Sequence, residues 1–345
     1  MSGDVILLAH GSGGTLSHDL VEKVFLRHFD NPALLQLDDS AVLEISNLQP
    51  PSSNLRLAFT TDSYVVSPLF FPGGDIGKLA VCGTVNDLSM SGARPLWLSA
   101  GFIVEEGLPL ADLERIVASM ATTARQAGVQ IVAGDTKVVD RGSADKLFIN
   151  TAGVGLVPPG VSIAGDLAQP GDLILLNGTI GDHGMTILTQ REGLQFDSPL
   201  ESDCVPLYGL VGSLLAALPP GSIHCLRDPT RGGLATTLNE LAIRSMAGIE
   251  IDESVVPVRD AVRGACELLG LDPLYVANEG KLVAIVEPEA AEAALAALHN
   301  HEYGRQAVII GQVTKAHPGR VVLRTLLGAR RIVDMLMGEQ LPRIC

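Results

Sequence analysis

Short β-like apolar runs alternate with helical segments along the whole chain, and this alternation limits the possible folds more than any other feature. Interleaved strands and helices predict a mixed α/β (α+β) protein. In the first half the expected elements are residues 55–62, 75–90, 94–104, 108–128, 129–135 and 146–157. In the second half they are residues 172–178, 231–248, 281–288, 289–301 and 307–313, with a hairpin within 320–335.

A stretch rich in proline and glycine, residues 157–172, separates the two halves of this pattern. The chain has 345 residues, which is more than one core usually serves, so two domains are expected. We predict an N-terminal domain over residues 1–157, a C-terminal domain over residues 158–337 and a flexible tail over residues 338–345.

The formal net charge of the chain is −15. Such a surface disfavours binding to nucleic acid and docking on an anionic membrane. The apolar start of the chain lacks the basic flank of a signal peptide, and no apolar run reaches the ~18–20 residues that span a bilayer. These features predict a cytoplasmic protein. An anionic ligand can still bind where backbone N–H groups and a metal ion offset its charge.

The five cysteines are Cys82, Cys204, Cys225, Cys266 and Cys345, and no two have C-x-x-C spacing. This argues against a disulfide framework and against a zinc knuckle. Four of them lie in or beside apolar stretches and are expected to be buried thiols. Cys345 differs because it ends the sequence, and a prenylation site would need three further residues. A cysteine at a chain end is most often incidental, so its role depends on the other motifs.

Apolar runs in the first half end repeatedly at aspartates among small residues, namely Asp38 with Asp39, then Asp62, Asp87 and Asp135. Side chains at strand ends converge on the rim of a domain, and Mg²⁺ prefers carboxylate and phosphate oxygens. One such aspartate is more simply a turn residue or a helix cap. The set predicts a metal–phosphate site. Lys137 would balance the charge of a phosphoryl group there, or else be an ordinary solvated lysine.

Two glycine-rich turns, residues 10–14 and 227–234, precede helical segments and are candidate anion cradles. Thr230 or Asp228 would cap the second helix. Neither turn has the spacing of a Walker A loop, and most glycine-rich turns bind nothing. Glu279 immediately precedes the expected strand 281–288, where it is either a turn residue or a general base.

Together these motifs resemble those of the HypE family of hydrogenase maturation proteins. That family belongs to the ATP-binding superfamily of aminoimidazole ribonucleotide synthetase, selenophosphate synthetase and thiamine-monophosphate kinase. The aspartate motifs are shared across the superfamily, whereas the final PRIC is typical of HypE. The matching segments are HGSGG (10–14), LDDSA (37–41), FTTDS (59–63), VNDLSMSGARP (86–95), AGDTKV (133–138), RDPTRGGL (227–234), NEG (278–280) and PRIC (342–345).

The resemblance implies a two-domain, aminoimidazole ribonucleotide synthetase-like fold whose N-terminal sheets pair into a barrel across a homodimer. It implies that ATP and Mg²⁺ serve to dehydrate a carboxamide on the sulfur of Cys345, placed there by the carbamoyltransferase HypF. The resulting thiocyanate would pass its cyanide to iron on a HypC–HypD complex during NiFe-hydrogenase assembly.

The resemblance also implies roles for single residues. Cys345 would be the covalent carrier, Glu279 the base that removes N–H protons, and Lys137 the group that steadies developing charge. Asp39, Asp62, Asp87 and Asp135 would hold Mg²⁺. The residues in contact with ATP would be these four aspartates with Gly11, Ser12, Gly13, Gly14, Asp228, Thr230, Arg231 and Gly232.

Two other interpretations remain open on the sequence alone. A small-molecule synthetase or kinase of the same superfamily would share every internal motif but would have no use for Cys345. A catalytically silent scaffold that binds hydrogenase-assembly proteins would not turn over ATP.

Overall fold

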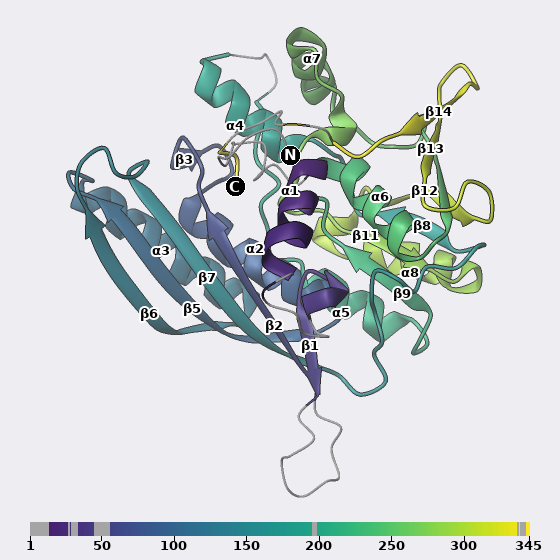
Figure 1. The fold of residues 1–345 in the computed structure, drawn as a ribbon, viewed down its shortest axis with the longest axis horizontal. Coiled ribbons are helices and arrows are strands. Elements are labelled where there is room, and N and C mark those ends of the chain that lie inside the picture. Colours follow the sequence, from purple (N-terminus) through teal and green to yellow (C-terminus); the bar gives the residue numbers. More distant parts are fainter. Residues whose placement is uncertain are drawn as a thin grey trace, which may run out of the picture.

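The structure is a computed structural model that describes residues 14–26, 28, 34–44, 56–194, 199–336, 338 and 343–345. The described residues form two α/β domains side by side, each built on its own sheet (Figure 1). The mixed α/β class agrees with the prediction.

The N-terminal domain is a five-stranded sheet with two long helices on one face (Figure 1). Only the β5–β6 pair is parallel among the described strands of this sheet. A short hairpin of β3 (Phe70–Phe71) and β4 (Gly74–Asp75) precedes the first long helix, α2 (Ile76–Met90), and the second is α3 (Leu110–Ala127). The strand order is β1 (Ala41–Glu44), β2 (Arg56–Tyr64), β7 (Leu147–Val157), β5 (Arg94–Glu105) and β6 (Gln130–Val139).

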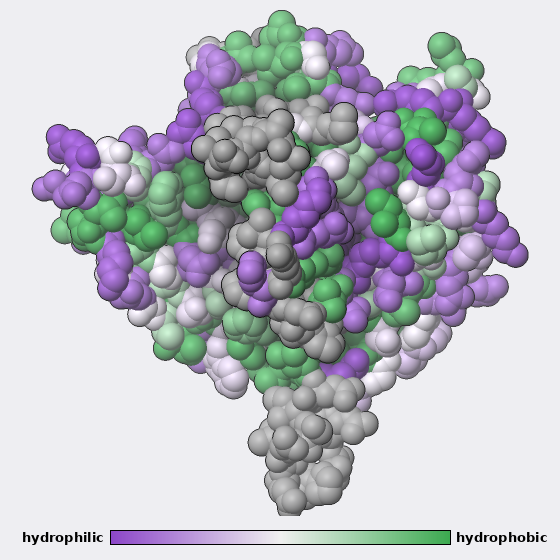
Figure 2. All heavy atoms as spheres, viewed as in Figure 1, coloured by the Kyte–Doolittle hydropathy of each residue, from purple (hydrophilic) through white to green (hydrophobic). Residues whose placement is uncertain are grey.

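The face of this sheet opposite the helices is partly apolar. Phe59 of β2 and Trp97 of β5 both pair with Val154 of β7, so the three side chains form a row across the sheet. Phe59 is 44% exposed and Trp97 is 48% exposed. Figure 2 shows apolar surface among polar groups on the left of the molecule, where β5, β6 and β7 lie. Within the described residues the sheet is open, with β1 and β6 at its edges.

The C-terminal domain is a seven-stranded sheet with helices packed around it (Figure 1). The strand order is β14 (Arg330–Val333), β13 (Val321–Arg324), β10 (Gly248–Asp252), β12 (Val308–Thr314), β8 (Leu173–Leu176), β11 (Val283–Val286) and β9 (Ile223–Arg227). The helices are α4 (Asp182–Glu192), α5 (Tyr208–Ala217), α6 (Gly233–Arg244), α7 (Asp260–Leu269) and α8 (Ala291–His299). Strands β13 and β14 form the predicted hairpin.

Shorter elements complete the fold. Helix α1 (Thr15–Leu20) continues into a π-helical turn (Val21–Leu26), and 3-10 turns occur at Leu34–Gln36, Pro273–Tyr275, Pro288–Ala290 and Glu302–Gly304. All five cysteines lie in the described part of the chain as free thiols, four of them buried, as expected. The helices of the described segments are each too short or too polar to cross a membrane.

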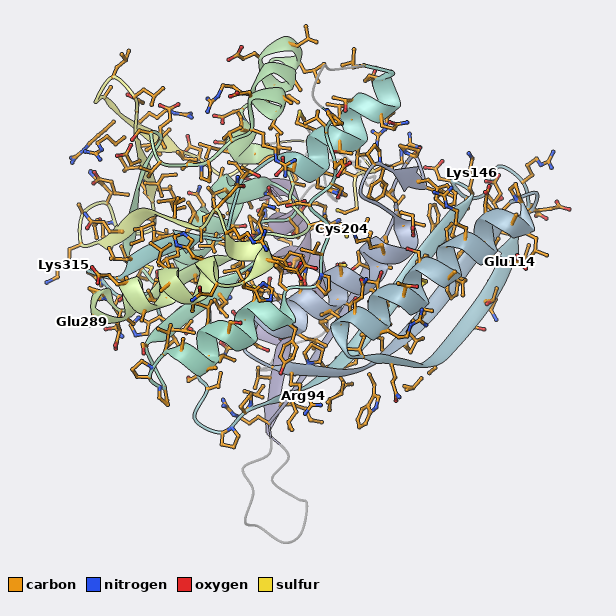
Figure 3. All side chains as sticks on the ribbon, turned by 180° about the vertical axis from the view of Figure 1, so that it is seen from behind. Arg94, Glu114, Lys146, Cys204, Glu289 and Lys315 are labelled. Carbon is orange, nitrogen blue, oxygen red and sulfur yellow. The ribbon has the colours of Figure 1, made fainter. Side chains whose placement is uncertain are left out.

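Asn86 of α2 joins the two domains. Its side-chain amide donates to the carbonyl oxygens of Val205 (3.1 Å) and Glu279 (3.3 Å) and accepts from the N–H of Leu207 (2.7 Å). The neighbouring Cys204 lies midway in the molecule, between Lys146 of the N-terminal domain and Lys315 at the far side of the C-terminal domain (Figure 3). The segment around Cys204 is therefore part of the domain junction.

Candidate active site

Carboxylates from three elements meet at the domain junction. Asp39 precedes β1, Asp87 lies in α2, and Asp228 directly follows β9. One carboxylate oxygen from each lies within 4.8 Å of those of the other two. We call these three residues the acid cluster. Their oxygens are the ligands that a hard divalent cation prefers, so the cluster fits Mg²⁺.

Burial makes the acid cluster costly to ionise. It raises the pKa of Asp39 and Asp87 well above the usual range and that of Asp228 to about 6. The neighbouring carboxylates raise these pKa values further, because like charges disfavour ionisation. Thr60 offsets part of the cost by donating a hydrogen bond of 2.9 Å to Asp87. A bound cation would favour the ionised forms.

Arg227, which the sequence analysis did not single out, holds one member of the acid cluster in place. Its Nε lies 2.7 Å from Asp39, and its Nη2 lies 2.8 Å from Glu240 of α6. The adjacent Asp38 pairs instead with Arg244, at 2.6 Å. The two arginines thus turn the consecutive aspartates to different partners.

Asp62 and Asp87 lie inside regular elements, in the strand expected over 55–62 and the helix expected over 75–90, and not in turns or at helix caps. Asp62 belongs to β2, where it shares the inward register of the buried Thr60 and Tyr64. Asp87 belongs to α2. Burial raises the pKa of Asp62, and the nearby Arg231 opposes the rise. Regular backbone therefore fixes both carboxylates more firmly than a turn would.

A cavity of about 30 Å³ lies beside the acid cluster. It brings together the candidate carrier Cys345, the candidate base Glu279 and five of the residues expected to contact ATP. Its lining residues are Asp62, Ser63, Tyr64, Gly83, Asp87, Asp228, Thr230, Arg231, Glu279 and Cys345. Ser63, Tyr64 and Gly83 were not predicted, although Ser63 belongs to the matching segment FTTDS.

The turn between β9 and α6 shapes one wall of this cavity. Gly232 has φ +80° and Gly233 has φ +61°, in the left-handed region that favours glycine. Gly232 is the N-cap of α6, and among the described residues no side chain caps the helix. The prediction that Thr230 or Asp228 would cap it is therefore wrong. Both of these residues line the cavity instead.

Glu279 is buried, with 3% of its surface exposed. Its main-chain N–H donates a hydrogen bond of 3.0 Å to Asp203. Burial, with help from the nearby Cys204 and Asp228, raises the pKa of Glu279 well above the usual range. A carboxyl group with a raised pKa, facing a cavity, is suited to take up a proton.

Residues 343–345 of the expected tail are docked against the chain that follows β2. The N–H of Val65 donates to the carbonyl oxygen of Cys345 (3.1 Å), and the N–H of Ser67 donates to that of Arg343 (3.2 Å). Between them Ile344 forms an antiparallel bridge with Val66, and the Ile344 side chain is buried in the core of the N-terminal domain. The tail end is thus held by a single β-bridge that leads Cys345 into the cavity.

The thiol of docked Cys345 is neutral. Burial raises its pKa to about 12, although the cation of Arg231 opposes the rise. The thiolate, not the thiol, is the nucleophilic form of cysteine. In this position Cys345 is suited to carry a group and not to attack one.

Asp135 and Lys137 lie outside the cavity, on the edge strand β6. Lys137 Nζ is 3.2 Å from Asp135 Oδ2, and both side chains are 71% exposed. Hydrogen bonding to Lys137 lowers the pKa of Asp135. Within the described part of a single chain, neither residue joins the acid cluster or lines the cavity.

Of the first glycine-rich turn, Gly11, Ser12 and Gly13 lie outside the described residues. Gly14 is the buried N-cap of α1. A Cβ at Gly14 would lie 2.1 Å from the carbonyl oxygen of Leu336. Any larger residue at position 14 would collide with the backbone at Leu336, so close packing is sufficient to require glycine there.

Comparisons with known proteins agree with this geometry. The family AIR synthase related protein, N-terminal domain, matches residues 37–157, and the C-terminal domain of the same family matches residues 169–324. Carbamoyl dehydratase HypE of Azotobacter vinelandii is 57% identical over 338 residues, which are 98% of this chain and 96% of that protein.

Solved structures of high similarity include two that contain HypE. A HypE–HypF complex matches with a TM-score of 0.85 and 50% identity, over 92% of this chain and 99% of that one. Hydrogenase maturation protein HypE in complex with ATP matches with a TM-score of 0.81 and 55% identity, over 99% of this chain and 100% of that one. The chain belongs to the HypE family of hydrogenase maturation proteins, within the AIR synthase related proteins.

Proposed function

We propose that this protein uses ATP and Mg²⁺ to dehydrate an S-carbamoyl group on Cys345 to a thiocyanate, which supplies cyanide for the iron centre of NiFe-hydrogenase. One observation carries the proposal: Cys345 and Glu279 line one cavity with two members of the acid cluster, Asp87 and Asp228. The similar proteins named carbamoyl dehydratase HypE, HypE with ATP and HypE–HypF support it.

The reaction needs a leaving group, because the oxygen of an amide does not leave as it stands. ATP supplies the phosphoryl group that this oxygen takes away, so S–C(=O)NH₂ and ATP give S–C≡N, ADP and inorganic phosphate. Asp39, Asp87 and Asp228 would hold Mg²⁺ together with Asp62, and Arg231 would bind phosphate oxygens. The Thr230–Gly232 turn would contribute main-chain N–H groups at the start of α6.

Glu279 would take the N–H protons of the carboxamide, since its raised pKa gives it the basicity for that step. Arg231 lies beside both Cys345 and Glu279 and would balance the charge that this transfer creates. The docked Cys345 forms part of the wall of this cavity, a position for which a small-molecule synthetase or kinase would have no use. This favours the carrier function over these alternatives.

A second copy of the chain would complete the assembly. The sheet face that carries Phe59, Trp97 and Ile103 is unusually apolar for a surface in contact with water. In β6, Asp135 pairs with Gly101 and Lys137 pairs with Ile103, so both charged side chains lie on that same face. Two such faces packed together would form the barrel, and Asp135 and Lys137 would then serve the nucleotide at the interface.

HypF would deliver the carbamoyl group, and a HypC–HypD complex would accept the cyanide. For the first transfer Cys345 must leave the cavity, because its docked thiol is neutral and the thiolate is the nucleophilic form. For the second transfer it must leave so that the thiocyanate can reach an acceptor on another protein. The docked position in the structure would therefore alternate with an undocked one.

Intact mass spectrometry tests the proposal. After incubation with HypF and a carbamoyl donor the chain should gain the mass of one carboxamide, and after addition of ATP and Mg²⁺ it should lose the mass of one water. Cys345→Ala should show neither change, while Cys266→Ala, in α7, should behave as the wild type does. An ATP-dependent loss of water from Cys345→Ala would place the modified group elsewhere.

A further inference from the structure

We infer that His183 is a positioning residue, whose imidazole holds the main chain of Ile344 and thereby sets the depth at which the Cys345 sulfur lies in the cavity. The purpose of this contact rests on the proposed function. The contact itself does not, and it can be tested without ATP or a carbamoyl group.

Hydrogen bonds fix the imidazole of His183 in one tautomer. Its Nε2 lies 2.6 Å from the carbonyl oxygen of Ile344, and its Nδ1 lies 2.7 Å from Ser202 Oγ. A carbonyl oxygen can only accept, so Nε2 carries the hydrogen. Ser202 Oγ already accepts from the N–H of Cys204 (3.2 Å), and its own hydrogen is available for Nδ1. The neutral ring therefore donates to the tail and accepts from Ser202.

The surroundings of His183 keep this arrangement rigid. The residue is fully buried in the first turn of α4, and Phe71 packs edge-on against the ring at a centroid distance of 5.7 Å. Burial lowers the pKa of His183, which keeps the ring neutral near pH 7. A neutral donor on a buried ring suits an uncharged carbonyl acceptor.

Arg191 supplies a second contact from the same helix. Its Nη2 donates to the carbonyl oxygens of Ser67 (2.9 Å) and Arg343 (2.7 Å), and its Nε donates to Ser67 (3.1 Å). Helix α4 thus binds the main chain of two successive tail residues, Arg343 and Ile344. Main-chain contacts fix the direction and depth of the tail whatever its side chains are.

The same short segment that orients His183 also orients the candidate base. Ser202 bonds His183, and the next residue, Asp203, accepts from the main-chain N–H of Glu279 at 3.0 Å. Residues 202–203 therefore hold Ile344, through His183, and also hold Glu279 directly. This common support would fix the position of the Glu279 carboxyl relative to a group carried on Cys345.

The rate of alkylation of Cys345 by iodoacetamide in the full-length protein tests the inference, because the other four cysteines are at most 1% exposed. His183→Leu keeps the bulk of the side chain and removes the donor, so labelling of Cys345 should accelerate about five- to tenfold. His183→Gln keeps an N–H at similar reach and should stay within about twofold of the wild type. His301→Leu is the control, since His301 bonds Tyr303 elsewhere in the same domain.

An unchanged labelling rate in folded His183→Leu protein would overturn the inference. If His183→Leu exposes all five cysteines, Ser202→Ala decides instead, because it leaves the imidazole in place and removes the hydroxyl that fixes its tautomer, together with the weaker bond from the N–H of Cys204. A rise of about two- to threefold confined to Cys345 then supports the inference, and labelling at the wild-type rate overturns it. The mass assay for dehydration does not depend on these labelling rates. Failure of the proposed function is therefore distinguishable from failure of the inference about His183.

Discussion

The main-chain N–H of Val65 donates a hydrogen bond of 3.1 Å to the carbonyl oxygen of Cys345. Val65 directly follows β2, the strand that carries Asp62. Cys345 is therefore held by the backbone segment that directly follows the strand supplying a carboxylate to the same cavity. Thiol and carboxylate keep their relative positions for as long as this β-bridge and its hydrogen bonds last.

Docking of the tail should weaken in alkaline solution. The pKa of docked Cys345 is raised to about 12, whereas an exposed thiol titrates near ~8.5. The docked state favours the protonated thiol, so docking is fully stable below ~8.5 and is lost as the pH rises toward the docked value. The alkylation rate of Cys345 should keep rising above pH ~9, where that of glutathione levels off. Levelling at the same pH as glutathione would contradict the docked geometry.

Glu279→Gln should slow dehydration by about 10²–10⁴-fold and leave ATP binding intact, because the amide keeps the shape of the carboxylate without its basicity. In the wild type the rate should rise with pH, since the raised pKa of Glu279 leaves its basic form scarce in acid. Thiocyanate formation is followed by intact mass. Glu289→Gln, on the far side of the C-terminal domain (Figure 3), is the matched control. Equal rates in both variants would assign the base to another group.

Asp87→Asn should have opposite effects with and without nucleotide. In the absence of nucleotide, the loss of one negative charge relieves repulsion within the acid cluster. The midpoint of thermal unfolding at pH 8 should therefore rise by about 2 °C or more. With Mg²⁺ and ATP, the stabilisation seen in the wild type should largely vanish. Asp252→Asn removes a carboxylate paired with Arg324 and should keep the full nucleotide response. A wild-type response in Asp87→Asn would exclude this residue as a metal ligand.

Phe59→Glu should prevent self-association, because it places a charge in the apolar row of the N-terminal sheet. Light scattering should give the mass of two chains for the wild type and of one chain for the variant. Leu110→Glu is the control, since Leu110 is 70% exposed at the start of α3, a helix that packs on the opposite face. A variant that keeps the mass of the wild type would place the interface on another surface.

Periodicity predicts several of the elements that bury one face and leave the other in water, although the one-sided helix α7 was missed. The amphipathic stretch 108–128 became α3, and the alternating run 55–62 became β2. Helix α5 (Tyr208–Ala217) was missed, because YGLVGSLLAA is apolar on nearly every side and gives no periodic contrast. The alternation of strand-like and helical segments was thus sufficient to predict the fold class but not to locate every element.

The site was partly predictable for a related reason. The aspartates of the matching motifs do gather where Asp39, Asp62, Asp87 and Asp228 lie, whereas Asp135 does not join them, since β5 and β7 separate β6 from β2. His183 gave no signal of its role. Its partner is a main-chain carbonyl 161 positions further along the chain. Every residue type has such a carbonyl, so the sequence at position 344 does not indicate the contact.

The apolar row of the N-terminal sheet also has an optical consequence. Trp97 is the single tryptophan of the chain, and it lies half-exposed in that row. Indole emission shifts to shorter wavelength when water is removed from the ring, so the fluorescence of this protein comes from one surface and reports whether that surface is covered. If two copies pair through this face as proposed, the same emission reports their association, and dilution can be followed without any attached dye.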